Sequence, residues 1–293
     1  LINAIFRGAG DATLAMRTLW IANGINIILD PCLINGWGPF PRLGVLGAAV
    51  ATTAGRSIGV LFQLWQLHSG KHRIVVERRH LHLNLPVLWK LLKVSLTGIL
   101  QFLVVTCSYL GLVRIVSSFG SAAIAGYTIA IRMIVFTILP AWGLSNAAAT
   151  LVGQNLGARK PERAEQAVYR TGFYTMIYML IVSGAFLFFP APLVSIFSAG
   201  PGIARTAVAC LSILSFGYVA YAWGMVFMQA FNGAGDTVTP TLINLFAFWI
   251  LQIPVAYVLA ITYTLGPRGA FTAIPIADLA FTLIAFVLFR RGT

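Results

Sequence analysis

The hexapeptide Phe6–Asp11 (FRGAGD) returns as Phe231–Asp236 (FNGAGD), 225 residues further along the chain. The same offset continues downstream without an insertion, because Gly44 falls on Gly269. Each copy consists of a polar loop, a long apolar segment, a turn with Gly or Pro, and a second apolar segment. Chance similarity between two apolar regions is the alternative, but matched glycines and an aspartate in order favour an internal duplication. We therefore expect two halves related by a parallel repeat of about 225 residues.

The repeat also predicts how much of a whole protein the sequence contains. The second half begins near Leu85, so its counterpart would begin about 140 residues before Leu1. On this arithmetic we expect the sequence to be the C-terminal two-thirds of a protein of roughly 430–450 residues.

The composition is that of a membrane protein. Of the residues, 59% are hydrophobic and 9% are charged, and the mean hydropathy is +0.87. Soluble domains carry about 25% charged residues. The net charge of +13 could indicate nucleic-acid binding, but the basic residues stand in short groups between apolar runs. That pattern is typical of membrane topology, so we expect a lipid bilayer and no nucleic acid as partners.

Apolar length predicts an all-α polytopic membrane protein. A helix needs about 20 apolar residues to cross the hydrocarbon layer. Leu1–Phe6 resembles the tail of an earlier crossing. About eight complete crossings are expected, at 14–34, 44–68, 87–117, 121–150, 165–190, 204–231, 238–263 and 270–289.

The loops between these segments alternate in charge. One set carries eleven basic residues and the other carries Arg42, Arg205 and Arg268. The positive-inside rule places the richer set, which includes the C-terminus, in the cytoplasm. The eleven residues are Arg7, Arg17, Lys71, Arg73, Arg78, Arg79, Arg159, Lys160, Arg163, Arg290 and Arg291.

The longest polar stretch divides the chain. It holds four histidines between His68 and His82, which in principle could bind a metal. Their spacing is irregular and Glu77 is their only acidic neighbour, so a solvated linker is favoured. We expect residues 1–68 to end an N-terminal lobe, 69–85 to form a cytoplasmic linker between the lobes, and 86–293 to form a C-terminal lobe of six helices.

The most distinct candidate site lies in the first complete crossing. Asn23, Asn26 and Asp30 recur at i, i+3 and i+7, which puts them on one helical face. A carboxylate at membrane depth costs at least about 2.5–3.5 kcal/mol, so it is seldom there without a partner or a role. Pro31 disfavours helical geometry at Asp30, and a distorted helix would free carbonyl oxygens. Such oxygens suit a hard cation or a transferable proton.

Two alternatives apply to this candidate. Asp30 could lie at the outer interface and only cap the end of its helix. Thr52, in the next crossing, could add a hydroxyl to the cluster, or it could pack within the run of small residues from Gly47 to Ala51. The sequence predicts a coupling cluster of Asp30, Asn26, Thr52 and Asn23, with no metal beyond a sodium ion at Asp30.

The second half differs chemically from the first. Asp278 is its only acid within a crossing, and the repeat aligns it with Thr53. It could bind a coupling ion, but an ion pair with Arg132 or Arg114 is favoured, since these are the only basic residues assigned to crossings. Arg132 itself could also face a wet cavity.

A second set of residues could line a substrate cavity. Tyr218, Tyr221, Met225 and Met228 form a stripe in the sixth crossing, and Gln101 belongs to a polar face of the third. Methionine and aromatic side chains make an adaptable surface for varied apolar molecules, although ordinary helix packing gives the same pattern.

Several chemistries lack their motifs. The Gly-Ala-Gly loops lack the third glycine of a dinucleotide-binding loop, and there is no Walker motif or HExxH pair. The three cysteines stand alone in or beside apolar segments, which is typical of packing residues. We therefore expect neither an enzyme nor a cofactor.

At this point the ordered motifs resemble the multidrug and toxic compound extrusion (MATE) family. The resemblance covers essentially the whole chain, from the end of the fourth family helix through the twelfth. It rests on Asn26–Asp30 (NIILD), Gly44–Thr52 (GVLGAAVAT), the two Gly-Ala-Gly-Asp loops, Pro140–Ser145 (PAWGLS) and Val152–Arg159 (VGQNLGAR).

The resemblance implies two lobes of six helices with rocker-type alternating access, driven by entry of sodium ions or protons. It implies small, amphipathic, mostly cationic organic substrates, a monomer, and a multi-pass protein of the inner membrane. The family's Asn and Asp one turn apart carry over onto Asn26 and Asp30, and its Thr onto Thr52. A partner acid in the family's first helix would precede Leu1, so we expect the present chain alone not to transport.

This sequence departs from one branch of the family. That branch has a glutamate in its seventh helix and an aspartate in its tenth, whereas 87–117 and 204–231 contain no acid here. Because these two acids are absent, Asp30 becomes the stronger candidate for the ion-coupling site. Two other functions remain open: a flippase for lipid-linked oligosaccharides in the same superfamily, which would need a strongly cationic cavity, and a membrane enzyme or scaffold.

Overall fold

The protein is described by a computed structural model, which covers residues 2–69, 74, 82–197 and 200–292. The chain falls into two compact units, residues 1–85 and 86–293. Both are helical, and no strand occurs in the described ranges. The expected linker at 69–85 lies mostly outside the described residues, so its assignment stays a prediction.

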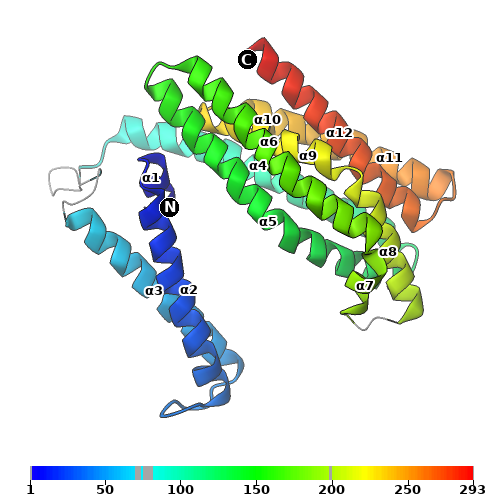
Figure 1. The fold of residues 1–293 in the computed structure, drawn as a ribbon, viewed down its shortest axis with the longest axis horizontal. Helices are drawn as coiled ribbons and strands as arrows, with labels where there is room; N and C mark the ends of the chain where they lie inside the picture. Colours follow the sequence, from blue (N-terminus) through cyan, green and yellow to red (C-terminus); the bar gives the residue numbers. More distant parts are fainter. Residues whose placement is uncertain (1, 70–73, 75–81, 198–199, 293) are drawn as a thin grey trace. The chain divides into compact units, whose positions relative to one another are not determined.

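Unit 1 (residues 1–85) is built from a short helix and two long ones. These are α1 (Ile2–Gly8), α2 (Ala12–Asn35) and α3 (Val45–His68). Helices α2 and α3 run side by side (Figure 1). Their interface depends on small residues, because a Cβ added at Gly47 would stand 2.3 Å from the Leu33 carbonyl oxygen. Only glycine lets the two backbones approach this closely.

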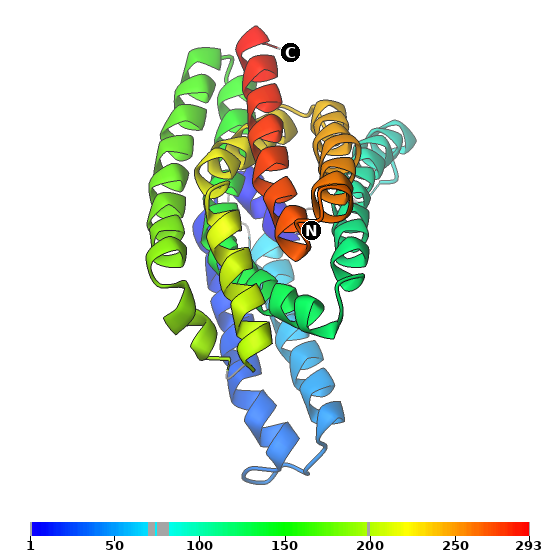
Figure 2. The same cartoon turned by 90° about the vertical axis from the view of Figure 1, so that its right-hand side faces the viewer.

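Unit 2 (residues 86–293) holds the remaining crossings. Helix α5 packs against α6, α8 and α9, and Figure 2 shows α12 between α9 and the segment that runs from α10 to η3. The elements are α4 (Leu85–Ser117), α5 (Ser121–Gly157), α6 (Pro161–Phe188), α7 (Pro190–Ser195), α8 (Pro201–Ser215), α9 (Tyr218–Gly233), α10 (Val238–Asn244), η2 (Leu245–Gln252), α11 (Ile253–Tyr257), η3 (Val258–Thr262) and α12 (Pro267–Arg291).

The expected crossings all correspond to helices. In the described part of the chain, seven helices are long and apolar enough to span a membrane, and an eighth span results if a bent pair is counted as one. That pair is α8 and α9, which meet at an angle of 58°. This break was not predicted. The expected end of the fourth crossing, near residue 150, was too early, because α5 continues to Gly157.

The break between α8 and α9 is fixed by contact with another helix. A Cβ at Gly217 would stand 2.9 Å from the Pro275 Cα and 3.0 Å from the Asp278 Oδ2. The residues before it form tightened i→i−3 hydrogen bonds, such as Gly217 N–H to the Leu214 carbonyl at 3.0 Å. The glycine therefore lets α12 press against the chain where the helical hydrogen bonding is interrupted.

The sequence repeat is also a repeat of structure. Gly10 and Gly235 have φ of +87° and +85°, a left-handed conformation that glycine adopts without strain. The next N–H bonds back over five residues in both copies, from Asp11 to the Phe6 carbonyl at 2.8 Å and from Asp236 to that of Phe231 at 3.0 Å. Both aspartates then cap the following helix. The duplicated hexapeptide thus encodes one helix-ending turn, used twice.

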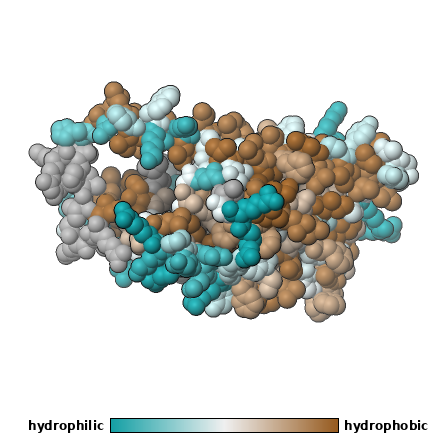
Figure 3. Space-filling view, turned by 90° about the horizontal axis from the view of Figure 1, so that it is seen from above, coloured by the Kyte–Doolittle hydropathy of each residue, from teal (hydrophilic) through white to brown (hydrophobic). Residues whose placement is uncertain are grey.

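The surface is suited to lipid. Large side chains are exposed on many helices, including Trp89 at 73%, Phe136 at 78% and Phe188 at 80%. Brown, hydrophobic side chains cover much of the face in Figure 3, while teal, hydrophilic ones gather along part of its edge. Helices satisfy their backbone hydrogen bonds internally, so they can carry such a surface in a bilayer. The chain is a multi-pass membrane protein.

Candidate functional site

In unit 1, three of the predicted coupling residues lie together. The Asn26 amide nitrogen is 3.4 Å from the Asp30 Oδ1 and 3.4 Å from the Thr52 Oγ1. With the amide turned over, its NH2 donates to the Asp30 Oδ2 at 3.2 Å and its oxygen accepts from the Thr52 backbone N–H at 3.3 Å. In either orientation Asn26 connects the carboxylate on α2 to α3.

Close packing of α2 and α3 creates this contact. Ala51 and Gly55 are buried on either side of Thr52, and a Cβ at Gly55 would stand 2.7 Å from the Ala22 carbonyl oxygen. Because the helices approach so closely, Thr52 reaches the face that carries Asn26. Thr53 does not join them, since its hydroxyl donates to the Ala49 carbonyl of its own helix at 2.8 Å.

Asp30 lies within a helix rather than at its end. Helix α2 continues through Pro31 to Asn35 and is closed by Gly36, so the aspartate does not cap it. The expected loss of helical geometry at Asp30 is not seen. Pro31 has no N–H, however, so the Ile27 carbonyl lacks its usual helical donor. A carbonyl without a helical partner therefore lies one turn before the proline, on the same helix as the carboxylate.

Two other polar residues stand apart from this cluster. Asn23 is exposed and makes no hydrogen bond to Asn26, Asp30 or Thr52 in the described structure. Arg56 follows Thr52 by one turn on α3 and is also exposed. Arg56 lies in the expected span 44–68, although only Arg114 and Arg132 were expected as basic residues within crossings; Lys90, Lys93 and Arg170 also lie in expected spans.

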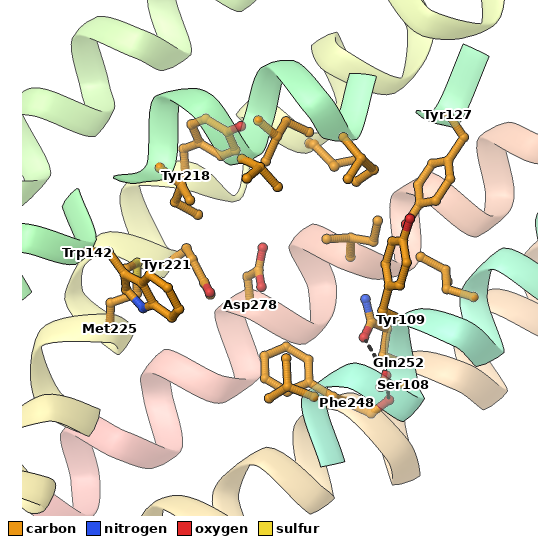
Figure 4. Close-up of a pocket in the computed structure, with 18 of the residues that line it drawn as sticks. Ser108, Tyr109, Tyr127, Trp142, Tyr218, Tyr221, Met225, Phe248, Gln252 and Asp278 are labelled. Atoms are coloured by element: carbon orange, nitrogen blue, oxygen red, sulfur yellow. Dashed lines mark hydrogen bonds between the residues drawn. The ribbon is translucent and has the colours of Figure 1, made fainter. Parts of the chain in front are cut away.

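Unit 2 contains a pocket of about 380 Å³, drawn in Figure 4. Its wall is mostly aromatic and aliphatic and draws on helices α4, α5, α8, α9 and α12 and on η2. The volume is in the range of ligand pockets. Six aromatic side chains line it: Tyr109, Tyr127, Trp142, Tyr218, Tyr221 and Phe248.

A second pocket of about 320 Å³ adjoins the first. Tyr221 and Met225 line both pockets, Tyr218 lines the first, and Gln101 and Met228 line the second. The structure thus places all five predicted cavity residues on one of two adjoining pockets.

The pockets also hold polar contacts that sequence reasoning missed. Ser108 Oγ donates to the Phe248 carbonyl at 2.7 Å and lies 3.3 Å from the Gln252 Oε1. Phe248 belongs to the π-helix η2, and π-helical turns are frequent at functional sites. These partners are more than 100 residues apart in sequence, so no local pattern indicated them.

Asp278 lines the first pocket and is only 7% exposed. The ion pair that the sequence favoured is not found among the described residues. Arg114 and Arg132 are both exposed, and no lysine, arginine or histidine lines the pocket. Helical spacing alone does not determine whether Arg114 and Arg132 face the pocket or the outer surface, because that depends on how the neighbouring helices pack.

The described residues contain no group of three or more His, Cys, Asp or Glu side chains that could hold a metal. The polar atoms of the two sites are instead carboxylate, amide and hydroxyl oxygens, set in helices that can cross a bilayer. The class of protein is therefore a helical multi-pass membrane protein, with two candidate sites inside its helical units.

Comparison with known proteins identifies the family. The sequence profile of the MatE family matches residues 98–258, so the chain belongs to that family. A relative named "Probable multidrug resistance protein NorM" from Thermotoga maritima is 28% identical over 99% of this chain and 62% of its own length. A protein named "FAD transporter" from Shewanella oneidensis is 27% identical over 99% of this chain and 64% of its own.

The fold agrees with solved structures. One is described as the outward-facing conformation of a multidrug resistance MATE family transporter of the MOP superfamily. It matches with a TM-score of 0.90 and 26% identity, over 99% of this chain and 64% of its own. The chain thus spans slightly less than two-thirds of the length of the relatives it matches.

Proposed function

We propose that the protein is a secondary active exporter, which moves small amphipathic organic compounds across the cytoplasmic membrane in exchange for sodium ions or protons. The Asn26–Asp30–Thr52 contact carries the proposal. A half-buried carboxylate within a membrane helix, joined by an amide to a hydroxyl of the next helix, can take up and release a cation. The names of relatives that refer to multidrug resistance also support a transporter of small organic compounds.

Ion coupling requires that the carboxylate be loaded in one orientation of the transporter and empty in the other. A ligand that bound both orientations equally would not shift the balance between them. Asn26 links the two helices at this site, because it contacts the carboxylate on its own helix α2 and Thr52 on α3. We propose rocker-type alternating access of two lobes as the motion that this site controls.

The substrate would bind in the aromatic pockets of unit 2. Of the described residues, Asp278 is the only charged side chain on either pocket, which favours cationic over anionic compounds. A flippase for lipid-linked oligosaccharides would need cations to hold pyrophosphate. Neither pocket offers one, so the organic-cation exporter is the better supported function.

An export assay tests the proposal. Cells that express the full-length protein with Asp30→Asn should accumulate a fluorescent organic cation to the level of cells without the transporter, a loss of about 10-fold or more in export rate. Glu162→Gln removes an exposed acid at the start of α6 and serves as the matched control. Export that survives Asp30→Asn at equal protein levels would remove Asp30 from the mechanism. Export that depends on sodium or on pH would identify the ion.

A further inference from the structure

Asp278 occupies an unusual position in unit 2. It follows Pro275 by one turn on α12, and its carboxylate lies against Gly217, where α8 and α9 are interrupted. The side chain is drawn near the centre of the pocket in Figure 4, between Tyr221 and Gln252. The proposed export mechanism assigns it no part in ion coupling.

Among the residues that the structure describes, the carboxylate has no basic partner. The lining of its pocket contains no lysine, arginine or histidine, and no hydrogen bond to it occurs in the described structure. Burial of an unpaired charged carboxylate costs several kcal/mol, so such a group is neutralised by a proton or a bound cation. Because lipid rather than water surrounds the helices of a membrane protein, hydration from their outer surface does not offset that cost.

A proton fits this site better than a metal cation does. Hard cations need about six oxygen ligands. Among the side chains that line the pocket, Asp278 is the one carboxylate. The pocket wall is otherwise almost entirely apolar.

The other titratable groups around Asp278 are weak acids. Tyr109 of α4, Tyr127 of α5, and Tyr218 and Tyr221 of α9 line the same pocket. Cys210 of α8 is buried close to Tyr127 and Tyr218. The Tyr218 hydroxyl makes no hydrogen bond of good geometry, although Thr137 is nearby. Among the described groups around the pocket, Asp278 is the one carboxylic acid.

The internal repeat shows that this site is not a copy of the first. Asp30 of α2 aligns with Val255 of α11, whereas Asp278 of α12 aligns with Thr53 of α3. Each unit therefore carries one intramembrane acid in the same pair of helices, but on opposite members of that pair.

We propose that Asp278 is an exchangeable proton-binding site of unit 2, separate from the Asp30 cluster, and that an organic cation entering the aromatic pocket displaces its proton. The carboxyl O–H bond breaks, the proton passes to water, and the carboxylate left behind neutralises the cation. The aromatic rings add cation–π attraction around the same position. The displacement step builds on the proposed function, but the proton site itself does not.

Proton release measures the displacement directly. Tetraphenylphosphonium, a permanent organic cation, is added to the purified full-length protein in lipid nanodiscs, in weak buffer with a pH indicator. At a pH at which Asp278 is protonated, binding should release about one proton per cation from the wild type and from Asp30→Asn. Asp278→Asn should release less than about a tenth of that, and Asp278→Glu should restore it. Undiminished release from Asp278→Asn would overturn the proposal.

A second measurement needs no variant and covers the case in which Asp278→Asn does not fold. Dicyclohexylcarbodiimide reacts with protonated carboxyl groups in apolar surroundings, and mass spectrometry locates the adduct. The wild-type protein should be modified at Asp278, and modification should fall on raising the pH or adding tetraphenylphosphonium. An unmodified Asp278 in protein that reacts elsewhere would contradict the proton site. If the unmodified wild-type protein did not export organic cations although Asp278 reacted as expected, that result would count against the proposed function alone.

Discussion

At the scale of single residues, Asn26 is the group that connects Asp30 to the neighbouring helix. Its amide reaches both the carboxylate and Thr52, at distances near the upper limit for hydrogen bonds. Such long contacts are easily exchanged for contacts to an ion. In the proposed mechanism, Asn26 tunes the affinity of the coupling site, while Asp30 supplies the charge.

Asn26→Leu should weaken ion coupling without unfolding α2. Leucine is a good helix former, whereas the loss of a hydrogen bond to a charged group removes about 1.5–3 kcal/mol. The ion concentration for half-maximal export by the full-length protein should rise about 10- to 100-fold. A titration of export rate against sodium concentration or pH measures it.

Asn23→Leu is the matched control for that substitution. Asn23 lies on the same helix, about one turn earlier, and is exposed. It should leave the half-maximal concentration within about twofold of the wild type, as surface substitutions usually do. An equal shift for both variants would return Asn23 to the cluster, where the helical spacing alone had placed it.

At the scale of elements, the register of α2 and α3 depends on glycine. In Gly55→Ala the new methyl group would meet the Ala22 carbonyl at 2.7 Å, so the two helices must separate. Overpacking of this kind costs about 1–3 kcal/mol, and the thermal stability of the purified protein should fall accordingly. Coupling should weaken as well, because Thr52 moves away from Asn26.

Gly24→Ala tests the same chemical change in open space. Nothing lies within 4 Å of a Cβ at Gly24, which is also in α2. Alanine should stabilise this helix by up to about 1 kcal/mol. A loss of stability at Gly24 equal to that at Gly55 would show that helix packing is not the cause.

The second repeated turn should depend on its aspartate. Asp236 Oδ1 accepts from the backbone N–H groups of Val238 and Thr239, at 3.1 and 3.0 Å. Asp236→Ala should cost about 1 kcal/mol, and Asp236→Asn should recover most of it, since asparagine caps as well. Thermal unfolding of the two variants in detergent measures the difference. Equal stability of the wild type and the alanine variant would show that the cap contributes nothing.

These elements also show what the sequence could and could not predict. The turn at Gly235 was predictable because a positive φ and a capping aspartate are local requirements. The break at Gly217 was not, because it depends on Pro275 of another helix. Likewise, the spacing correctly placed Asp30 and Asn26 on one helical face. It could not predict that Asp278 lacks a basic neighbour among the described residues, because that depends on how the surrounding helices pack.

At the scale of the whole molecule, the basic loops predict orientation. The set with eleven basic residues should face the cytoplasm, together with the C-terminus. In a protein whose three native cysteines are replaced, a cysteine at Ala158 should react with a membrane-impermeant thiol reagent only after the cells are opened. One at Gly202 should react in intact cells, since a Cβ there meets nothing within 4 Å. The reverse pattern would invert the assignment.

The central claim is that Asp30 exchanges an ion for the substrate as the transporter changes orientation. The most direct measurement is ion flux driven by substrate, in proteoliposomes that contain the full-length protein. An outward gradient of an organic cation should draw sodium ions or protons inward through the wild type, but not through Asp30→Asn, although the variant still binds substrate. Substrate-driven ion flux through Asp30→Asn at the wild-type rate would contradict the account.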